Sequence, residues 1–261
     1  MIMMKAIEVL ERLNAYSAAV LTQTVDTRKA GSDEKETSRV AFCFTATADV
    51  IKAASEWGAD VLVTHEPTYH DHFDNFHDNA VAAAKRELLE STGMTVYRWH
   101  DHPHAAIPDI IHAGFLESSG LNGTLDGRYF ILDGEMTARE IAKQIEQSCG
   151  IKHARIIGAA DKPTKRVAMC LGACGDMVFD LLRNTDCETV IAGEICEWRE
   201  GCFVRDAAQL GFNKSVILLG HCGSERDGMK YLTDIWNTIC PEVPGKYFET
   251  GELYTYTEGD E

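Results

Sequence analysis

The chain has 261 residues and a formal net charge of −16, from 25 Lys and Arg against 41 Asp and Glu. No run of basic residues forms a stripe or a tail, so neither nucleic acid nor an anionic membrane surface is an expected partner. The length is sufficient for one large α/β domain or for two domains of ordinary size.

The N-terminal residues MIMMKAIEVLERLNAY lack the basic start, apolar run and cleavage site of a signal peptide. No segment approaches the roughly 18 consecutive apolar residues of a membrane helix. We therefore expect a soluble, cytoplasmic protein. The nine cysteines include no CxxC pair, and most are expected to be reduced apolar side chains.

Strand and helix patterns alternate in the first half of the chain. An amphipathic helix is expected near residues 3–14, and the charged residues 26–39 are expected to form a loop. The alternation then runs through VAFCF, a helix at 49–57, DVLVT, a helix at 79–91 and TVYRW. This order predicts βαβ units and a largely parallel sheet.

The second half repeats this order. The run VAFC at 40–43 returns as VAMC at 167–170, and each half later adds a helix, a strand and a histidine, His100 or His221. We interpret the similarity as an internal duplication, with coincidence between two βαβ units as the alternative.

The halves are joined by residues 128–165, which contain the strand-like RYFIL, a helix opened by the capping box of Thr137 and Glu140, and HARIIG. A domain boundary is plausible near residue 125 or near residue 165. We place the first αβ half at 1–125 and the second at 126–261, with the boundary left open.

Eight of the ten histidines lie between residues 65 and 112. The strand DVLVT ends at Thr64, so His65 and Glu66 emerge at the rim of the sheet, where sites form in parallel sheets. The strand ending at Trp99 delivers the sequence HDHPH, residues 100–104, beside them. Imidazole and carboxylate together suit zinc, iron, manganese or nickel. A surface location explains the remaining histidines of this stretch, His70, His72, His77 and His112.

A third set follows the apolar strand SVILL, in the sequence GHCGSERD at 220–227. Ser224 with Asp227 resembles a helix N-cap, which predicts Glu225 in the first helical turn and His221 in the loop before it. A histidine satisfied by protein groups is the alternative for His221.

Three strand ends, contributed by both halves, thus each present a histidine with a carboxylate or a second histidine nearby. The predicted fold class is α/β, with two pseudo-repeated αβ halves whose mixed, largely parallel sheets face one another across a metal site. Five or more ligands exceed the three or four of a single catalytic zinc. Two ions bridged by a carboxylate fit better.

Four motifs carry a family resemblance: ADVLVTHEP at 59–67, VYRWHDHPHA at 96–105, VIAGE at 190–194 and GHCGSE at 220–225. Together they resemble the Nif-three-like proteins, also called GTP cyclohydrolase I type-two homologues, whose members form rings around dinuclear metal centres. The resemblance implies two divalent ions per chain, zinc, iron or manganese. It also implies a homo-oligomer, specifically a ring hexamer.

The resemblance assigns the first histidine ligand to His65, the late histidine ligand to His221 and the glutamate that can bridge to Glu225. Glu66 stands where the family has its second histidine, and His104 stands where it has an aspartate.

The loop after Trp99 also offers Asp101 and His102 as alternative ligands. The family's aromatic, aspartate and asparagine signature near the N-terminus is replaced by TVDTRKAGSDEK at 24–35, so the pocket entrance is expected to differ.

We hypothesise a metal-dependent hydrolase of a small, phosphorylated or nucleotide-like substrate. Glu194 or Asp101 would act as general base, and a structural or outer-shell role is the alternative for Glu194. A non-catalytic ring-shaped scaffold or metal-handling protein is the second hypothesis, favoured by the surplus histidines at 70, 72 and 77. A mononuclear zinc amidohydrolase is the third.

Overall fold

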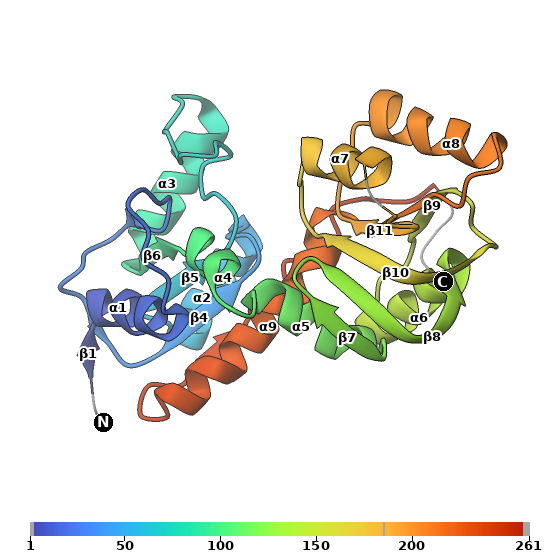
Figure 1. Cartoon of the computed structure of the whole chain (residues 1–261). Coiled ribbons are helices and arrows are strands. Elements are labelled where there is room, and N and C mark those ends of the chain that lie inside the picture. Colours follow the sequence, from blue (N-terminus) through green and yellow to red (C-terminus); the bar gives the residue numbers. More distant parts are fainter. Residues whose placement is uncertain (1–2, 185, 258–261) are drawn as a thin grey trace. The chain divides into compact units, whose positions relative to one another are not determined.

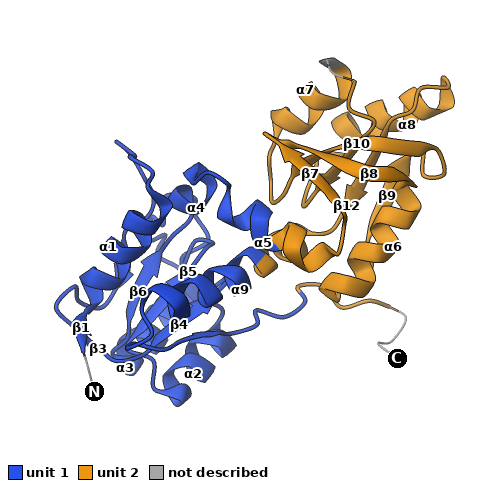
Figure 2. Ribbon diagram, turned by 60° about the horizontal axis from the view of Figure 1, so that its bottom comes forward, with its two compact units in different colours: residues 1–114, 228–252 blue, residues 115–227, 253–261 orange. Residues whose placement is uncertain are grey.

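The computed structural model describes residues 3–184 and 186–257 and forms two compact units (Figures 1 and 2). Unit 1 comprises Met1–Gly114 with Gly228–Glu252, and unit 2 comprises Phe115–Asp227 with Leu253–Glu261. The chain therefore leaves unit 1 after Gly114, returns to it at Gly228 and leaves it again after Glu252. Helices α5 (Ile110–Ser119) and α9 (His221–Ile239) contain the first two of these division points.

Unit 1 contains a five-stranded sheet of order β13-β4-β5-β6-β2 and a two-stranded sheet of β1 with β3. The strands are β1 (Met4–Lys5), β2 (Arg28–Ala30), β3 (Glu36–Thr37), β4 (Val40–Cys43), β5 (Val61–Thr64), β6 (Thr95–Arg98) and β13 (Gly245–Tyr247). The helices are α1 (Ala6–Ser17), α2 (Ala48–Trp57), α3 (Ala80–Thr92) and α4 (Asp101–Ala105).

The centre of this sheet is parallel and fully buried. Strands β4, β5 and β6 pair in parallel, and every residue of the three is buried. Alternate side chains of these strands, such as Ala41, Leu62 and Val96, form one cluster with α2 and α3. Burial on both faces explains why these strands are continuous apolar runs rather than alternating ones.

Unit 2 contains a six-stranded sheet of order β7-β8-β10-β11-β12-β9. Its strands are β7 (Gly123–Asp126), β8 (Tyr129–Thr137), β9 (Arg155–Gly158), β10 (Pro163–Cys170), β11 (Thr189–Ala192) and β12 (Ser215–Leu218). Its helices are α6 (Ala138–Cys149), α7 (Asp176–Asn184), α8 (Cys202–Gln209) and the π-helical turn Glu197–Gly201. Figure 1 shows α7 and α8 on one face of this sheet and α6 on the other.

The two sheets confirm the predicted mixed α/β fold. In unit 2 the parallel strands are β10, β11 and β12, matching β4, β5 and β6 of unit 1, and in each unit an antiparallel strand borders the third. The capping box is also present, because Thr137 accepts from Glu140 N and the Glu140 side chain accepts from Thr137 N.

Two local predictions were wrong. The segment 26–39 is not only loop, since it contains β2 and β3, which pair with β6 and β1. Helix α9 begins at His221, so Ser224 lies inside the helix instead of capping it. The Ser224 hydroxyl donates to His221 O at 2.8 Å and accepts from Gly172 N at 2.9 Å. The bond to His221 O lies within the helix start, and the bond from Gly172 N joins that start to the loop after β10.

In the described part of the chain, no helix combines the length and apolar character needed to span a membrane.

Candidate metal centre

Three histidines of unit 1 meet at the carboxyl ends of β5 and β6. His65 directly follows β5, His100 follows β6 by two residues, and His104 lies in α4. One ring nitrogen of each lies within 4.8 Å of the others. The His65 ring centroid is 4.7 Å from that of His100 and 5.1 Å from that of His104. The convergence follows from topology, because neighbouring parallel strands end at the same edge of a sheet.

Each of the three rings is held through Nδ1. The contacts are His65 Nδ1 with Trp99 O at 3.3 Å, His100 Nδ1 with Asp101 Oδ1 at 2.9 Å, and His104 Nδ1 with Asp109 Oδ2 at 3.0 Å. Metal-binding histidines are oriented in this way, by a carboxylate or a carbonyl on one nitrogen while the other binds the ion. The arrangement therefore leaves Nε2 of each ring as the nitrogen that could bind a metal.

The protonation state of His100 suits ligation. Burial, reinforced by the neighbouring His65, lowers the pKa of His100 to about 4, so its ring is neutral near pH 7. Burial by itself raises the pKa of Asp101, but hydrogen bonds from His100 and from Val25 N lower it overall, to about 2. Asp101 is consequently an anion that accepts from His100.

Glu66 lies between His100 and a buried arginine. Its Oε1 is 3.9 Å from His100 Nε2, and its Oε2 is 3.9 Å from Arg98 Nη2. The Arg98 side chain is only 1% exposed. Arg98 also donates from Nε to His65 O at 3.0 Å and from Nη1 to His72 O. This one guanidinium thus joins both sides of the loop that carries His65 and Glu66.

Of the other candidates in this loop, His102 lies away from the three rings. It is buried, stacks on Trp99 with an interplanar angle of 8°, and contacts Asp26 Oδ2 through Nδ1 at 2.7 Å. His104, by contrast, belongs to the histidine cluster.

Unit 2 carries a histidine and two carboxylates at the corresponding edge of its own sheet. His221 and Glu225 are one turn apart on α9, with His221 Nε2 3.2 Å from Glu225 Oε2. His221 Nδ1 lies 2.7 Å from Glu194 Oε1, in the loop after β11. His221 is therefore held on Nδ1 by a carboxylate, as the histidines of unit 1 are held.

Two glycines of unit 2 bring the backbone so close that little space remains around His221 and Glu225. Gly172 has a φ of +67°, and a Cβ there would lie 2.4 Å from Glu225 Oε1. A Cβ on Gly193 would lie 2.5 Å from Gly172 O. These two positions accept only glycine without displacement of their neighbours.

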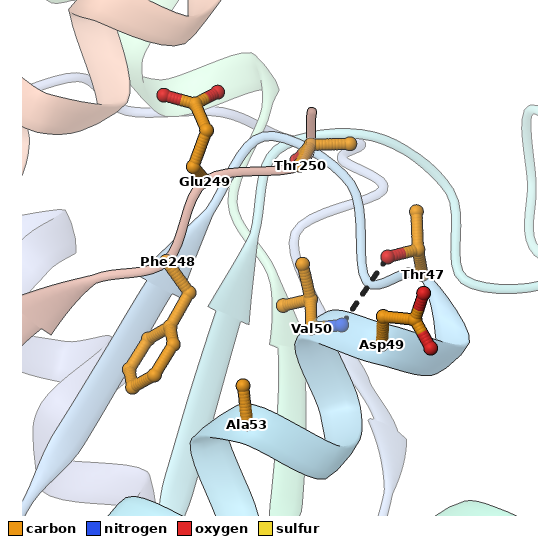
Figure 3. Close-up of a pocket in the computed structure, with 7 residues that line it drawn as sticks. All are labelled: Thr47, Asp49, Val50, Ala53, Phe248, Glu249 and Thr250. Atoms are coloured by element: carbon orange, nitrogen blue, oxygen red, sulfur yellow. Dashed lines mark hydrogen bonds between the residues drawn. The ribbon is translucent and has the colours of Figure 1, made fainter. Parts of the chain in front are cut away.

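A cavity of about 470 Å³ also opens in unit 1, beside the start of α2 (Figure 3). Thr47, Asp49, Phe248 and Thr250 are among its lining residues, and none of the candidate metal ligands is. The Thr47 hydroxyl accepts from Val50 N and caps the helix.

The donor set fits a borderline transition metal. Imidazole nitrogen suits zinc, iron and nickel, whereas magnesium and calcium prefer oxygen ligands throughout. Three imidazoles with a carboxylate beside them match the ligands of catalytic zinc sites. His100 was not among the ligands predicted from the sequence, although its place after a buried strand is the signal that identified His65. Asp109 was also missed, because nothing local marks its contact with His104.

Comparison with known proteins agrees with this fold. A hypothetical protein of Staphylococcus aureus superimposes with a TM-score of 0.78 at 14% identity, covering 97% of this chain and 99% of that chain. A Bacillus cereus protein related to NIF3 superimposes with a TM-score of 0.75 at 13% identity, covering 98% of each chain.

Sequence comparison identifies the family. A Clostridium perfringens protein named GTP cyclohydrolase 1 type 2 homolog is 26% identical over 206 residues, covering 75% of this chain and 76% of its own. Residues 4–246 match the family described as Duf34/NIF3 (NGG1p interacting factor 3). This match spans most of the sequence, and the chain therefore belongs to the Duf34/NIF3 family.

Proposed function

We propose that this protein binds two divalent metal ions and hydrolyses a small substrate, phosphorylated or nucleotide-like. The observation that carries the proposal is the set of three imidazoles in unit 1, each held through Nδ1 and each with a ring nitrogen within 4.8 Å of the others. A structural role alone does not require three buried or half-buried rings to be oriented alike.

The ligands in this proposal come from both units. His65, His100, His104 and Glu66 would hold metal in unit 1, and His221 and Glu225 are the ligands in unit 2. Neither group alone supplies enough donors for two ions at three or four protein ligands each. The assignment of these ligands to one dinuclear centre rests on the family resemblance.

When bound, two divalent ions lower the pKa of coordinated water and stabilise the negative charge that develops during hydrolysis. The protein's own part is to hold the ligands in place. Asp101 and Glu194 were candidates for the general base, but each contacts Nδ1 of a histidine, at 2.9 and 2.7 Å. Those contacts favour an orienting role for both carboxylates.

The name of the Clostridium relatives, GTP cyclohydrolase 1 type 2 homolog, is compatible with a nucleotide-like substrate. We further propose a cytoplasmic homo-oligomer, a ring hexamer by family resemblance.

The test begins with protein purified without added metal. Its metal content and solution mass are measured, and the metal-loaded protein is assayed against phosphoesters, nucleotides and cyclic amides. Two equivalents of metal per chain, with turnover that disappears in His221→Ala while the oligomer survives, would support the proposal. One equivalent would instead support a mononuclear amidohydrolase.

The second candidate function is metal handling by a non-catalytic scaffold. One observation favours it: an exposed histidine lies near the cluster. The His72 ring centroid is 6.2 Å from that of His100. A second exposed histidine of the same loop, His77, contacts Asp71 Oδ2 through Nε2 at 3.2 Å. A protein that binds metal, turns over none of the substrates and loses its assembly in His221→Ala would support this function.

A further inference from the structure

Asp26 makes an unusual set of contacts with the histidine loop of unit 1. Its side chain is fully buried. Oδ1 accepts from His100 N at 2.6 Å and from Asp101 N at 3.0 Å. Oδ2 accepts from His102 N at 2.8 Å and contacts His102 Nδ1 at 2.7 Å. One carboxylate thus receives three successive backbone N–H groups and an imidazole.

These contacts supply what the short helix α4 lacks. The helix has five residues, one of them Pro103, and its N-cap residue His100 makes no side-chain cap. A helix this short does not hold its conformation by itself, and its first N–H groups need acceptors. Asp26 provides these acceptors from a position 74 residues earlier in the chain.

A further bond ties the two segments together in the opposite direction, because Val25 N donates to Asp101 Oδ2 at 2.9 Å. Within the segment 24–26, Asp26 N donates to Thr24 Oγ1 at 3.0 Å. His102, held by Asp26, stacks on Trp99, whose Nε1 donates to Asn14 Oδ1 at 2.8 Å. The backbone from residue 100 to 102 is therefore held by Asp26 rather than by its own helix.

We propose that Asp26 is a positioning residue that sets His100 and His104 for metal binding. It acts through the backbone of α4. His100 lies at the start of this helix, and His104 lies in its last turn. The inference rests on the metal site proposed above, but it needs no particular substrate and no turnover.

The test compares Asp26→Asn with wild type in the full chain, using Co²⁺ as the probe. Asparagine keeps the size of the side chain but replaces one acceptor oxygen with an NH₂ group, which would face the donors around it. We expect Co²⁺ affinity to fall about 10- to 100-fold, as for other outer-shell partners of metal ligands. We also expect the visible absorption of bound Co²⁺ to change toward that of His100→Ala and His104→Ala.

Asp33→Asn is the matched control. Asp33 follows Asp26 by seven residues, and its Oδ1 accepts from the Tyr97 hydroxyl at 2.7 Å. Within the described part of the chain its side chain makes no hydrogen bond to residues 100–104. The control is expected to leave the Co²⁺ spectrum and affinity unchanged. If Asp26→Asn does not fold, His102→Phe replaces it. That variant keeps the ring on Trp99, loses the Nδ1 contact, and is expected to weaken Co²⁺ binding several-fold with the same spectral change.

The outcomes separate this inference from the proposed function. Wild-type affinity and spectrum in Asp26→Asn, or in His102→Phe where that variant is used, would overturn the role of Asp26 while leaving the metal site in place. A wild-type protein that binds no Co²⁺ would overturn both. A wild-type protein that binds Co²⁺ without hydrolysing any substrate, while Asp26→Asn binds weakly, would remove the hydrolase and support Asp26.

Discussion

The two units place different chemistry on the same three-stranded parallel centre. In unit 1, Cys43 pairs with Thr64, and in unit 2, Cys170 pairs with Ala192. The residue after the strand is consequently His65 in one unit and Gly193 in the other. The next residue is a glutamate in both, Glu66 or Glu194.

The two units consequently offer different kinds of candidate metal ligand. Unit 1 brings together three imidazoles, whereas the group in unit 2 is one imidazole with two carboxylates. Where unit 1 presents His65, unit 2 has no space for a side chain, because a Cβ on Gly193 would lie 2.5 Å from Gly172 O. The same strand ends thus give a group of mainly imidazole nitrogens in one unit and a group with two carboxylates in the other.

The largest expected effect tests the imidazole-rich side. His65 is fully buried and adjoins both other rings, so His65→Ala should lower metal affinity by more than the about 10- to 100-fold typical of outer-shell changes. Calorimetric titration with Zn²⁺ measures the change. The exposed His77→Ala is the control and should bind as wild type does. Equal affinity in His65→Ala and wild type would remove unit 1 as the imidazole-rich site.

How far the sequence predicts this site depends on whether a contact is local. His65 and Glu66 follow a recognisable buried strand, so strand-end reasoning located them, and the parallel order of the strands explains why His104 lies beside His65. Asp26 and Asp109 were not found. Asp26 accepts from the backbone of a loop that only the folded chain brings near. Asp109 is five residues from His104, but a spacing of five residues in the sequence does not mark a contact with that ring.

The start of α9 shows a conflict between local and tertiary signals. Ser224 and Asp227 have the spacing of a cap, but the Ser224 hydroxyl accepts from Gly172 N. The helix extends back to His221, which places His221 and Glu225 one turn apart on the same side. Local capping preference was therefore outweighed by a bond to a loop about 50 residues earlier.

The hydrophobic cores of the two units should contribute differently to the free energy of unfolding at alkaline pH. By strand register the buried Cys187 of unit 2 corresponds to Ala59 of unit 1. Burial raises the pKa of the Cys187 thiol to about 11 from an ordinary value of 9.0. Between these values the unfolded chain loses its proton first, so the free energy of unfolding falls as pH rises, by roughly 2–3 kcal/mol at pH 11.

Urea unfolding of wild type and Cys187→Ala from pH 8 to pH 11 measures this dependence. The variant is less stable at pH 8 because it leaves a cavity, but its stability should decline less steeply above pH 9. Parallel declines in the two proteins would show that Cys187 does not distinguish the cores.

The next effect concerns the group in unit 2 that contains two carboxylates. Glu194→Gln leaves a neutral group against His221 Nδ1, and metal affinity should fall about 10- to 100-fold if Glu194 orients the ring. Asp109→Asn makes the equivalent change at His104 in unit 1 and should weaken binding to a similar degree. Unchanged metal affinity in Glu194→Gln, together with lost turnover of any substrate found, would return Glu194 to the role of general base.

The smallest expected effect tests whether the glycine backbone of unit 2 is a requirement of its site. Gly172→Ala would place a Cβ 2.4 Å from Glu225 Oε1 and 3.0 Å from His221 Nε2, at a φ of +67°. The left-handed backbone alone should cost about 1–2 kcal/mol of stability, and displacement of Glu225 should weaken metal binding several-fold.

By register the corresponding residue of unit 1 is Thr45, so Thr45→Ala is the matched control. It should change neither the stability nor the metal affinity appreciably. Thermal unfolding and Zn²⁺ titration of both variants provide the measurement. If Gly172→Ala binds metal and unfolds as wild type does, the close approach at residue 172 does not shape the site, and the contrast between the units lies in their ligands alone.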